Sequence, residues 1–247
     1  MRLATVLQRC KWFYGIPMVL LAFLLLATHA GYAQVSVRNV QGDVVAYKLF
    51  VNPESPTAII FPTSQGDDKD LIGLARKFNH IGANAFVVPH SSEYSNPALS
   101  PDSLVHLMSN AVELAVRGGA KTPFVVAAQR MASIALIAAT RHFKIKGVVA
   151  ISPGEYFQPR SYVREHIQRL RIGTVLLYTP REEKLVSHMV KGIPRRLLIH
   201  SHVLRHMGYR DLLARGRVSG QAWLAISLFY NERLAADPSD EAPTPEP

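Results

Sequence analysis

One stretch of small and aliphatic residues in this 247-residue chain has a spacing that could support chemistry. It runs Phe124-Val-Val-Ala-Ala-Gln-Arg-Met-Ala-Ser-Ile-Ala-Leu136, a strand pattern that passes into a helix pattern without a loop. Small residues two positions before and two after a central residue permit such a tight turn, which presents the central side chain as a nucleophile. Ala128 and Ala132 fit the two small positions, so Arg130 is predicted at the centre. A guanidinium stays protonated and cannot attack a carbonyl, so the turn predicts binding rather than nucleophilic chemistry.

The charge of Arg130 requires a partner at this position. The positive end of the helix macrodipole disfavours a cation there by about 0.3–1 kcal/mol, and burial adds a larger cost unless an anion is near. We expect an internal ion pair with Glu183, or with Glu182 or Glu155 in its place. The alternatives are bidentate binding of a small anionic ligand, a carboxylate or phosphate, and a side chain that faces solvent.

Four further segments accompany the turn in a recognisable order. They are Phe61-Pro-Thr-Ser-Gln-Gly66, Gly147-Val-Val-Ala-Ile-Ser-Pro-Gly-Glu-Tyr-Phe157, Leu176-Leu-Tyr-Thr-Pro-Arg-Glu-Glu-Lys-Leu-Val186 and Arg205-His-Met-Gly-Tyr-Arg-Asp-Leu-Leu213. Over residues 44–233 the chain resembles the α/β-hydrolase superfamily, and within it the small dienelactone-hydrolase-like proteins. The guanidinium in the nucleophile position departs from that family.

The resemblance implies roles for particular residues. Glu183 matches the acid, His206 matches the catalytic histidine, and the amides of Thr63 and Met131 match the oxyanion hole. Without a hydroxyl at the turn, we expect a degenerate hydrolase that acts by binding and needs no cofactor. The alternative is an active hydrolase or esterase that uses Ser133 as a displaced nucleophile, or a water activated by His206.

The elements that must position these residues alternate along the chain. Most of the apolar runs are continuous rather than alternating, as in parallel strands covered on both faces. Strands are predicted at 35–40, 44–50, 57–61, 85–88, 124–128, 147–152, 174–179 and 197–201, the first two as a hairpin. Helices are predicted at 68–80, 102–117, 131–143, 161–170, 182–190 and 219–234. This order predicts an α/β three-layer sandwich with a mostly parallel eight-stranded sheet of the α/β-hydrolase type, formed by residues 34–235.

The two ends of the chain differ from this domain. Residues 1–33 combine three early cations with an uncharged run from 16 to 28 and small residues before Gln34, which predicts a signal peptide and an exported, periplasmic or secreted protein. Because residues 12–33 carry no formal charge, an uncleaved membrane anchor is the alternative. Residues 236–247 are acidic and proline-rich, which predicts a disordered tail.

The net charge of +10 suggests an anionic partner. For an exported protein this favours an anionic envelope surface over nucleic acid, and scattered solvated side chains are the alternative. The arginines that contribute most are Arg160, Arg164, Arg169, Arg171, Arg195, Arg196, Arg205, Arg210, Arg215 and Arg217. The spacing of His200, His202 and His206 is compatible with a metal, but no carboxylate accompanies them and we expect no metal site.

Overall fold

The computed structural model describes residues 34–38, 44–63, 68–201, 204–206 and 208–235. The predicted signal peptide (1–33) and tail (236–247) lie outside these ranges. Within the described ranges, no helix has both the length and the apolar character needed to cross a bilayer.

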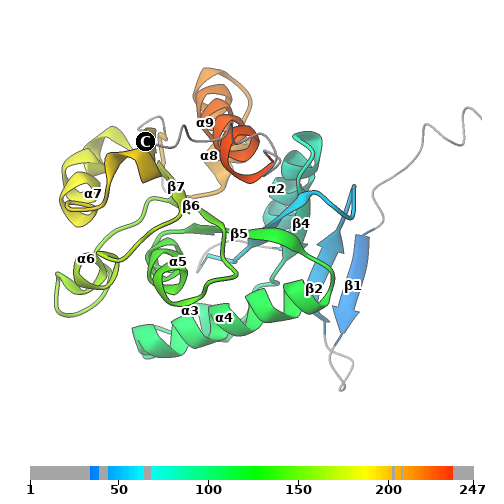
Figure 1. The fold of residues 1–247 in the computed structure, drawn as a ribbon, viewed down its shortest axis with the longest axis horizontal. Helices are drawn as coiled ribbons and strands as arrows, with labels where there is room; N and C mark the ends of the chain where they lie inside the picture. Colours follow the sequence, from blue (N-terminus) through cyan, green and yellow to red (C-terminus); the bar gives the residue numbers. More distant parts are fainter. Residues whose placement is uncertain (1–33, 39–43, 64–67, 202–203, 207, 236–247) are drawn as a thin grey trace, which may run out of the picture. The chain divides into compact units, whose positions relative to one another are not determined.

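The domain is built on one eight-stranded sheet with the order β1-β2-β4-β3-β5-β6-β7-β8 (Figure 1). The hairpin strands β1 and β2 pair antiparallel, β2 pairs antiparallel with β4, and all further neighbours pair parallel. The strands are β1 (Gln34–Arg38), β2 (Val44–Leu49), β3 (Pro56–Ile60), β4 (Asn84–Val87), β5 (Lys121–Ala128), β6 (Gly147–Ile151), β7 (Gly173–Leu177) and β8 (Leu198–Ser201). The predicted eight-stranded, mostly parallel sheet is confirmed.

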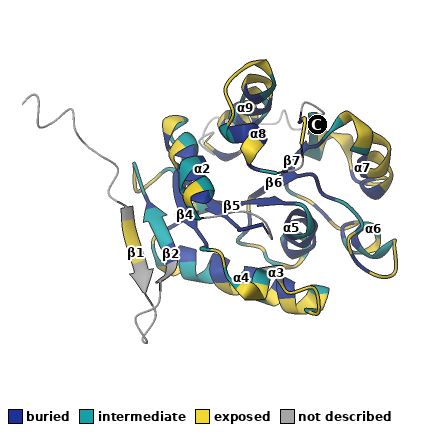
Figure 2. Cartoon of the chain, turned by 180° about the vertical axis from the view of Figure 1, so that it is seen from behind, coloured by how far each residue is buried: buried dark blue, intermediate teal, exposed yellow. Residues whose placement is uncertain are grey.

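Helices cover both faces of the sheet, because successive strand residues point to opposite sides. Ile59 and Phe61 belong to one apolar core, and Ala58 and Ile60 belong to the other. The first core includes residues of α4 (Pro101–Arg117), α5 (Arg130–Arg141), α6 (Tyr162–His166) and α7 (Glu183–Met189). The second includes residues of α2 (Asp68–His80), α8 (Arg210–Leu213) and α9 (Arg217–Phe229). Figure 2 shows the central strands buried between these two layers, which confirms the three-layer sandwich.

Several elements differ from the sequence prediction in extent. Helix α6 is five residues long instead of ten, and α9 ends at Phe229, after which a π-helical turn, Tyr230–Leu234, completes the segment. A short helix α3 (Ser92–Ser95) and two 3-10 turns, Pro180–Glu182 and Arg195–Leu197, were not predicted. Such short elements lack the two or three turns over which apolar periodicity becomes visible in a sequence.

Candidate functional site

The candidate site lies at the carboxyl edge of the parallel strands, where open α/β sheets form their binding crevices. Thr63 follows β3, Gln129 follows β5, Ser152 follows β6, Glu182 follows β7, and His206 lies in the connection after β8. The parallel pairing of these strands brings all five residues to one edge of the sheet.

The turn between β5 and α5 is strained at Gln129, with φ 54° and ψ −127°. A side chain in this region of backbone space costs of order 1–3 kcal/mol. The Gln129 amide donates to Ile151 O at 2.7 Å, and its carbonyl accepts from Ser133 N at 3.2 Å, so the main chain is fixed on both sides. The half-buried side chain makes no capping hydrogen bond to the helix.

The turn residue is therefore Gln129 and not Arg130. The strand continues through Ala128 and the helix begins at Arg130, which leaves a single residue for the reversal. The spacing of Ala128 and Ala132 predicted the centre of the turn one residue too late in the sequence. The amide that directly follows the turn residue, which the resemblance assigns to the oxyanion hole, is therefore that of Arg130 and not that of Met131. Met131 is a buried residue of the first helical turn.

Arg130 binds main-chain carbonyls rather than a carboxylate. Its Nη1 donates to Asn96 O and its Nη2 to Leu99 O, both at 2.7 Å, and the guanidinium lies 5.3 Å from the centre of the Phe157 ring. Burial lowers the pKa of Arg130. The expected ion pair with Glu183 is wrong, because two carbonyl oxygens of the α3–α4 connection take up the guanidinium.

Ser133, predicted as the alternative nucleophile, is fully buried in α5. Its hydroxyl donates to Gly154 O at 2.7 Å and accepts from Gly154 N at 3.0 Å. Both hydrogen-bonding functions of the hydroxyl thus attach the loop after β6 to the helix, and the side chain holds the loop rather than facing the turn.

A fixed carboxylate follows β7, and it belongs to Glu182. Its Oε2 accepts from Thr179 N at 2.7 Å, from Thr179 Oγ1 at 2.8 Å and from Ser152 Oγ at 3.3 Å. Ser152 is buried, with φ 50°. Glu183, the predicted acid, is an exposed residue at the start of α7. The sequence signal for Glu182 is a capping box, in which Thr179 and the residue three positions later exchange hydrogen bonds.

Tyr156 lies beside this carboxylate. Its hydroxyl donates to Ser152 O at 2.9 Å, and burial together with the charge of Glu182 raises the pKa of Tyr156 to about 12. The phenol therefore stays protonated and acts as a hydrogen-bond donor at neutral pH.

His206 lies exposed in the connection between β8 and α8, with its amide donating to Asp211 Oδ2 at 2.8 Å. In the described part of the chain, its imidazole has no hydrogen bond to Glu183 or Gln129. The loop that carries it is nevertheless tied to the loop of Thr63. Tyr209 donates its hydroxyl proton to the carbonyl of Phe61, two residues before the buried Thr63.

Of the three histidines in the run, His200 and His206 belong to the described residues and His202 lies outside them. His200 is exposed, with Nδ1 3.0 Å from the hydroxyl oxygen of Tyr178. Across the described ranges, no group of three or more histidine, cysteine, aspartate or glutamate residues is arranged to hold a metal ion.

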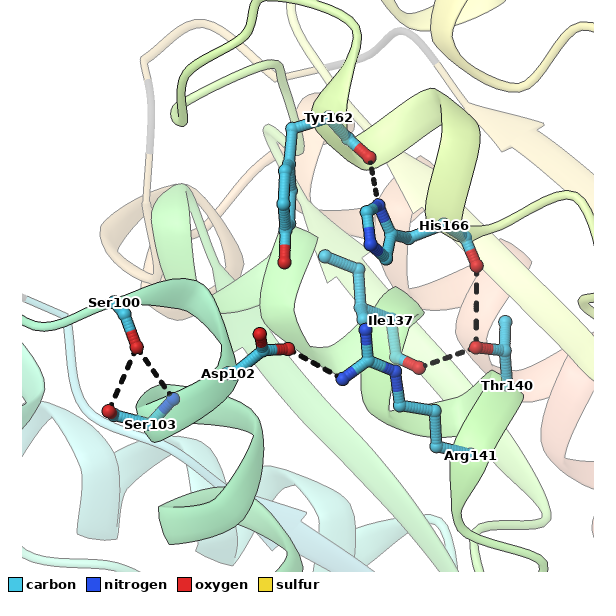
Figure 3. A network of polar contacts seen from close by, with 8 residues as sticks. All are labelled: Ser100, Asp102, Ser103, Ile137, Thr140, Arg141, Tyr162 and His166. Atoms are coloured by element: carbon cyan, nitrogen blue, oxygen red, sulfur yellow. Dashed lines mark hydrogen bonds and ion pairs between the residues drawn. The ribbon is translucent and has the colours of Figure 1, made fainter.

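A surface cavity of about 940 Å³ lies between α3 and the first turns of α4. Its polar lining includes Glu93, Asp102 and His106 but none of the predicted site residues. Asp102 pairs with Arg141 at 2.7 Å, and Figure 3 shows this pair near the stacked rings of Tyr162 and His166. Arg130 donates hydrogen bonds to the main-chain carbonyls of Asn96 and Leu99, two of the residues that line the cavity. The two carboxylates make the cavity a poor match for the expected anionic ligand.

The fold is shared with solved hydrolase structures. A dienelactone hydrolase from Anabaena variabilis is 13% identical with a TM-score of 0.59, over 82% of this chain and 98% of that one. A Klebsiella pneumoniae protein assigned as a dienelactone hydrolase is 12% identical with a TM-score of 0.63, over 81% of this chain and 98% of that one. A Pyrococcus furiosus esterase is 11% identical with a TM-score of 0.59, over 83% of this chain and 91% of that one.

At the level of sequence, no known protein family and no curated protein matches the chain. Identities of 11–13% establish the fold alone. The chain thus has the α/β-hydrolase fold, similar to that of dienelactone-hydrolase-like proteins.

Proposed function

We propose that this protein acts by binding a small anionic ligand at the carboxyl edge of the sheet, as a hydrolase-fold protein without serine chemistry. The observation that carries the proposal is Gln129 at the strained turn. A carboxamide donates and accepts hydrogen bonds but has no proton that an imidazole can remove to form a nucleophile. The backbone at this turn is the kind that presents a reactive side chain, and here it presents a binding one.

The chemistry around Gln129 favours an anion over a neutral ligand. Helix α5 begins at the next residue, and the unpaired amides of a first helical turn carry partial positive charge. A carboxylate can accept from these amides and from the Gln129 carboxamide together.

Fluorophosphonate labelling tests the loss of serine chemistry. We expect no labelled serine in the full chain under conditions that label an active esterase fully. Stoichiometric labelling of any serine would overturn the proposal. Ester hydrolysis without labelling that disappears in His206→Ala would instead support a histidine-activated water.

Thermal-shift titration with a panel of mono- and dicarboxylates tests the binding role. A carboxylate that raises the melting temperature of the wild type should have little effect on Gln129→Ala. Gln168→Ala, at an exposed glutamine after α6, is the matched control and should keep the shift. An unchanged shift in Gln129→Ala would place the ligand elsewhere.

We further propose that the protein is exported, as the first 33 residues suggest. Intact mass of the protein recovered from the periplasm or medium tests this, and we expect a mature chain that begins at Gln34. A full-length chain in the membrane fraction would support the anchored alternative.

A further inference from the structure

The edge of the sheet opposite the candidate site carries a row of cations. Since β5, β6, β7 and β8 are parallel neighbours, their amino ends meet at one edge. An exposed cation begins or precedes each of these strands, and another comes from the end of the last helical segment, where Arg233 Nη2 is 3.4 Å from Arg196 O. We call this set the basic rim: Lys121, Lys146, Arg171, Arg195, Arg196 and Arg233. With strands about 4.8 Å apart, the four amino ends span roughly 14 Å.

The cations of the basic rim are not neutralised by carboxylates in the described residues. Where their side chains form hydrogen bonds, the acceptors are main-chain carbonyls, as for Arg171 with Leu170 O at 2.9 Å. The nearby carboxylate of Glu113 is occupied by Lys144 at 2.6 Å and His142 at 3.3 Å. Among the described residues, the exposed Glu232, next to Arg233, and the exposed Glu54, two residues before β3, are further acidic neighbours. The rim therefore keeps a large positive excess.

Exposed apolar side chains flank the basic rim on both faces of the sheet. Phe143, in the connection from α5 to β6, is 81% exposed and lies three residues before Lys146. On the opposite face, Leu228 near the end of α9 is 46% exposed. The end of α9 reaches this edge, because the ring of its last residue, Phe229, packs against Gly147 at the start of β6. A Cβ atom on residue 147 would lie only 2.5 Å from Cζ of Phe229.

We propose that the basic rim docks the protein on a membrane surface rich in anionic lipids. The cations attract the headgroups, and the exposed aromatic and aliphatic side chains that flank them enter the boundary of the acyl region. A soluble polyanion would satisfy the cations but would leave Phe143 and Leu228 in water, so the combination favours a bilayer. In this orientation the candidate site at the other edge of the sheet faces away from the membrane.

Sedimentation with lipid vesicles tests this surface in the full chain. The readout is the ratio of binding to vesicles of phosphatidylcholine with phosphatidylglycerol over binding to phosphatidylcholine alone. Every variant keeps the same N-terminal run and its three cations, so a change in this ratio between variants reports the substituted residues. Each cation near such a surface changes the partition about fivefold. The double variant Lys146→Glu/Arg195→Glu should lower the ratio at least tenfold. Raising the salt to 1 M should do the same to the wild type.

The matched control is Lys69→Glu/Arg76→Glu, with the same charge change at two exposed residues of α2. It should retain most of the ratio, and an equal loss in both variants would mean that net charge alone drives binding. A wild-type ratio near one overturns the proposal. The wild type could instead bind dextran sulfate without preferring anionic vesicles. If Phe143→Ser leaves that binding unchanged, the basic rim is a surface for soluble polyanions.

A fluorophore at residue 143 locates the contact. In the variant Cys10→Ser/Phe143→Cys, an environment-sensitive dye should shift to shorter wavelength on anionic vesicles. Vesicle binding without this shift would mean that another part of the chain makes the contact. These measurements are independent of ligand binding at Gln129, so the failure of one proposal leaves the other standing.

Discussion

Tyr209 donates a hydrogen bond from its hydroxyl to the main-chain carbonyl of Phe61, 148 residues earlier in the chain. The bond is fully buried and joins the loop after β8, which carries His206, to the loop after β3, which carries Thr63. Two segments that the resemblance assigned to one site are thus held together by a residue that had no predicted role.

Removing this hydroxyl should destabilise the domain. In Tyr209→Phe the Phe61 carbonyl stays buried without its donor, which costs about 1–3 kcal/mol. Urea denaturation should show this loss in the free energy of unfolding. Tyr47→Phe, at a half-buried tyrosine of β2, is the control and should change it by less than about 0.5 kcal/mol. Equal stability of Tyr209→Phe and the wild type would contradict the importance of the bond.

Replacing the strained glutamine by glycine should stabilise the domain. Gln129→Gly relieves a backbone strain of order 1–3 kcal/mol and adds about 0.5–1 kcal/mol of unfolded-state entropy. We therefore expect a gain of about 1 kcal/mol in the free energy of unfolding, together with loss of carboxylate binding. The same substitution at Gln221, exposed in α9, should instead cost about 1 kcal/mol. A loss at both positions would argue that residue 129 is unstrained.

Arg130 should act as a structural clamp on the α3–α4 connection. Arg130→Met removes both hydrogen bonds to Asn96 O and Leu99 O, and hydrogen bonds from charged groups contribute about 1.5–3 kcal/mol each. We expect faster amide hydrogen exchange across residues 92–100 and a lower melting temperature. Arg117→Met, at an exposed arginine that ends α4, should leave this exchange unchanged. Unchanged exchange in Arg130→Met would free the guanidinium for a ligand role.

Two phenols with raised pKa values, half-buried Tyr94 and partly exposed Tyr156, should make the domain sensitive to alkali. Burial, with the charge of Glu93 beside Tyr94 and of Glu182 beside Tyr156, raises both pKa values from 10.0 to about 12. The folded state favours the protonated phenol, so this contribution to stability is complete below pH 10 and is lost as the pH rises through 12. Tyrosinate absorbance at 295 nm should include a phase near pH 12 that shrinks in Tyr156→Phe. Complete ionisation near pH 10 while the fold persists would contradict these shifts.

The sequence alone determined the architecture of this protein. Continuous aliphatic runs such as 124–128 and 147–151 have few alternatives to buried parallel strands, and their order with the intervening helices specifies the three-layer sheet. The order also places the ends of β3, β5, β6, β7 and β8 at one edge, so the location of the candidate site followed from the sequence.

The tertiary structure decided which residues occupy that site. Gln129 and Arg130 are neighbours in the sequence, and the choice between them depends on where the strand's hydrogen bonds stop, which residue types do not encode. The same holds for Glu182 over Glu183 and for the carbonyl partners of Arg130, since each depends on loops brought together by distant segments. Apolar periodicity is a property of many residues at once, whereas the role of a single polar side chain depends on the few atoms around it.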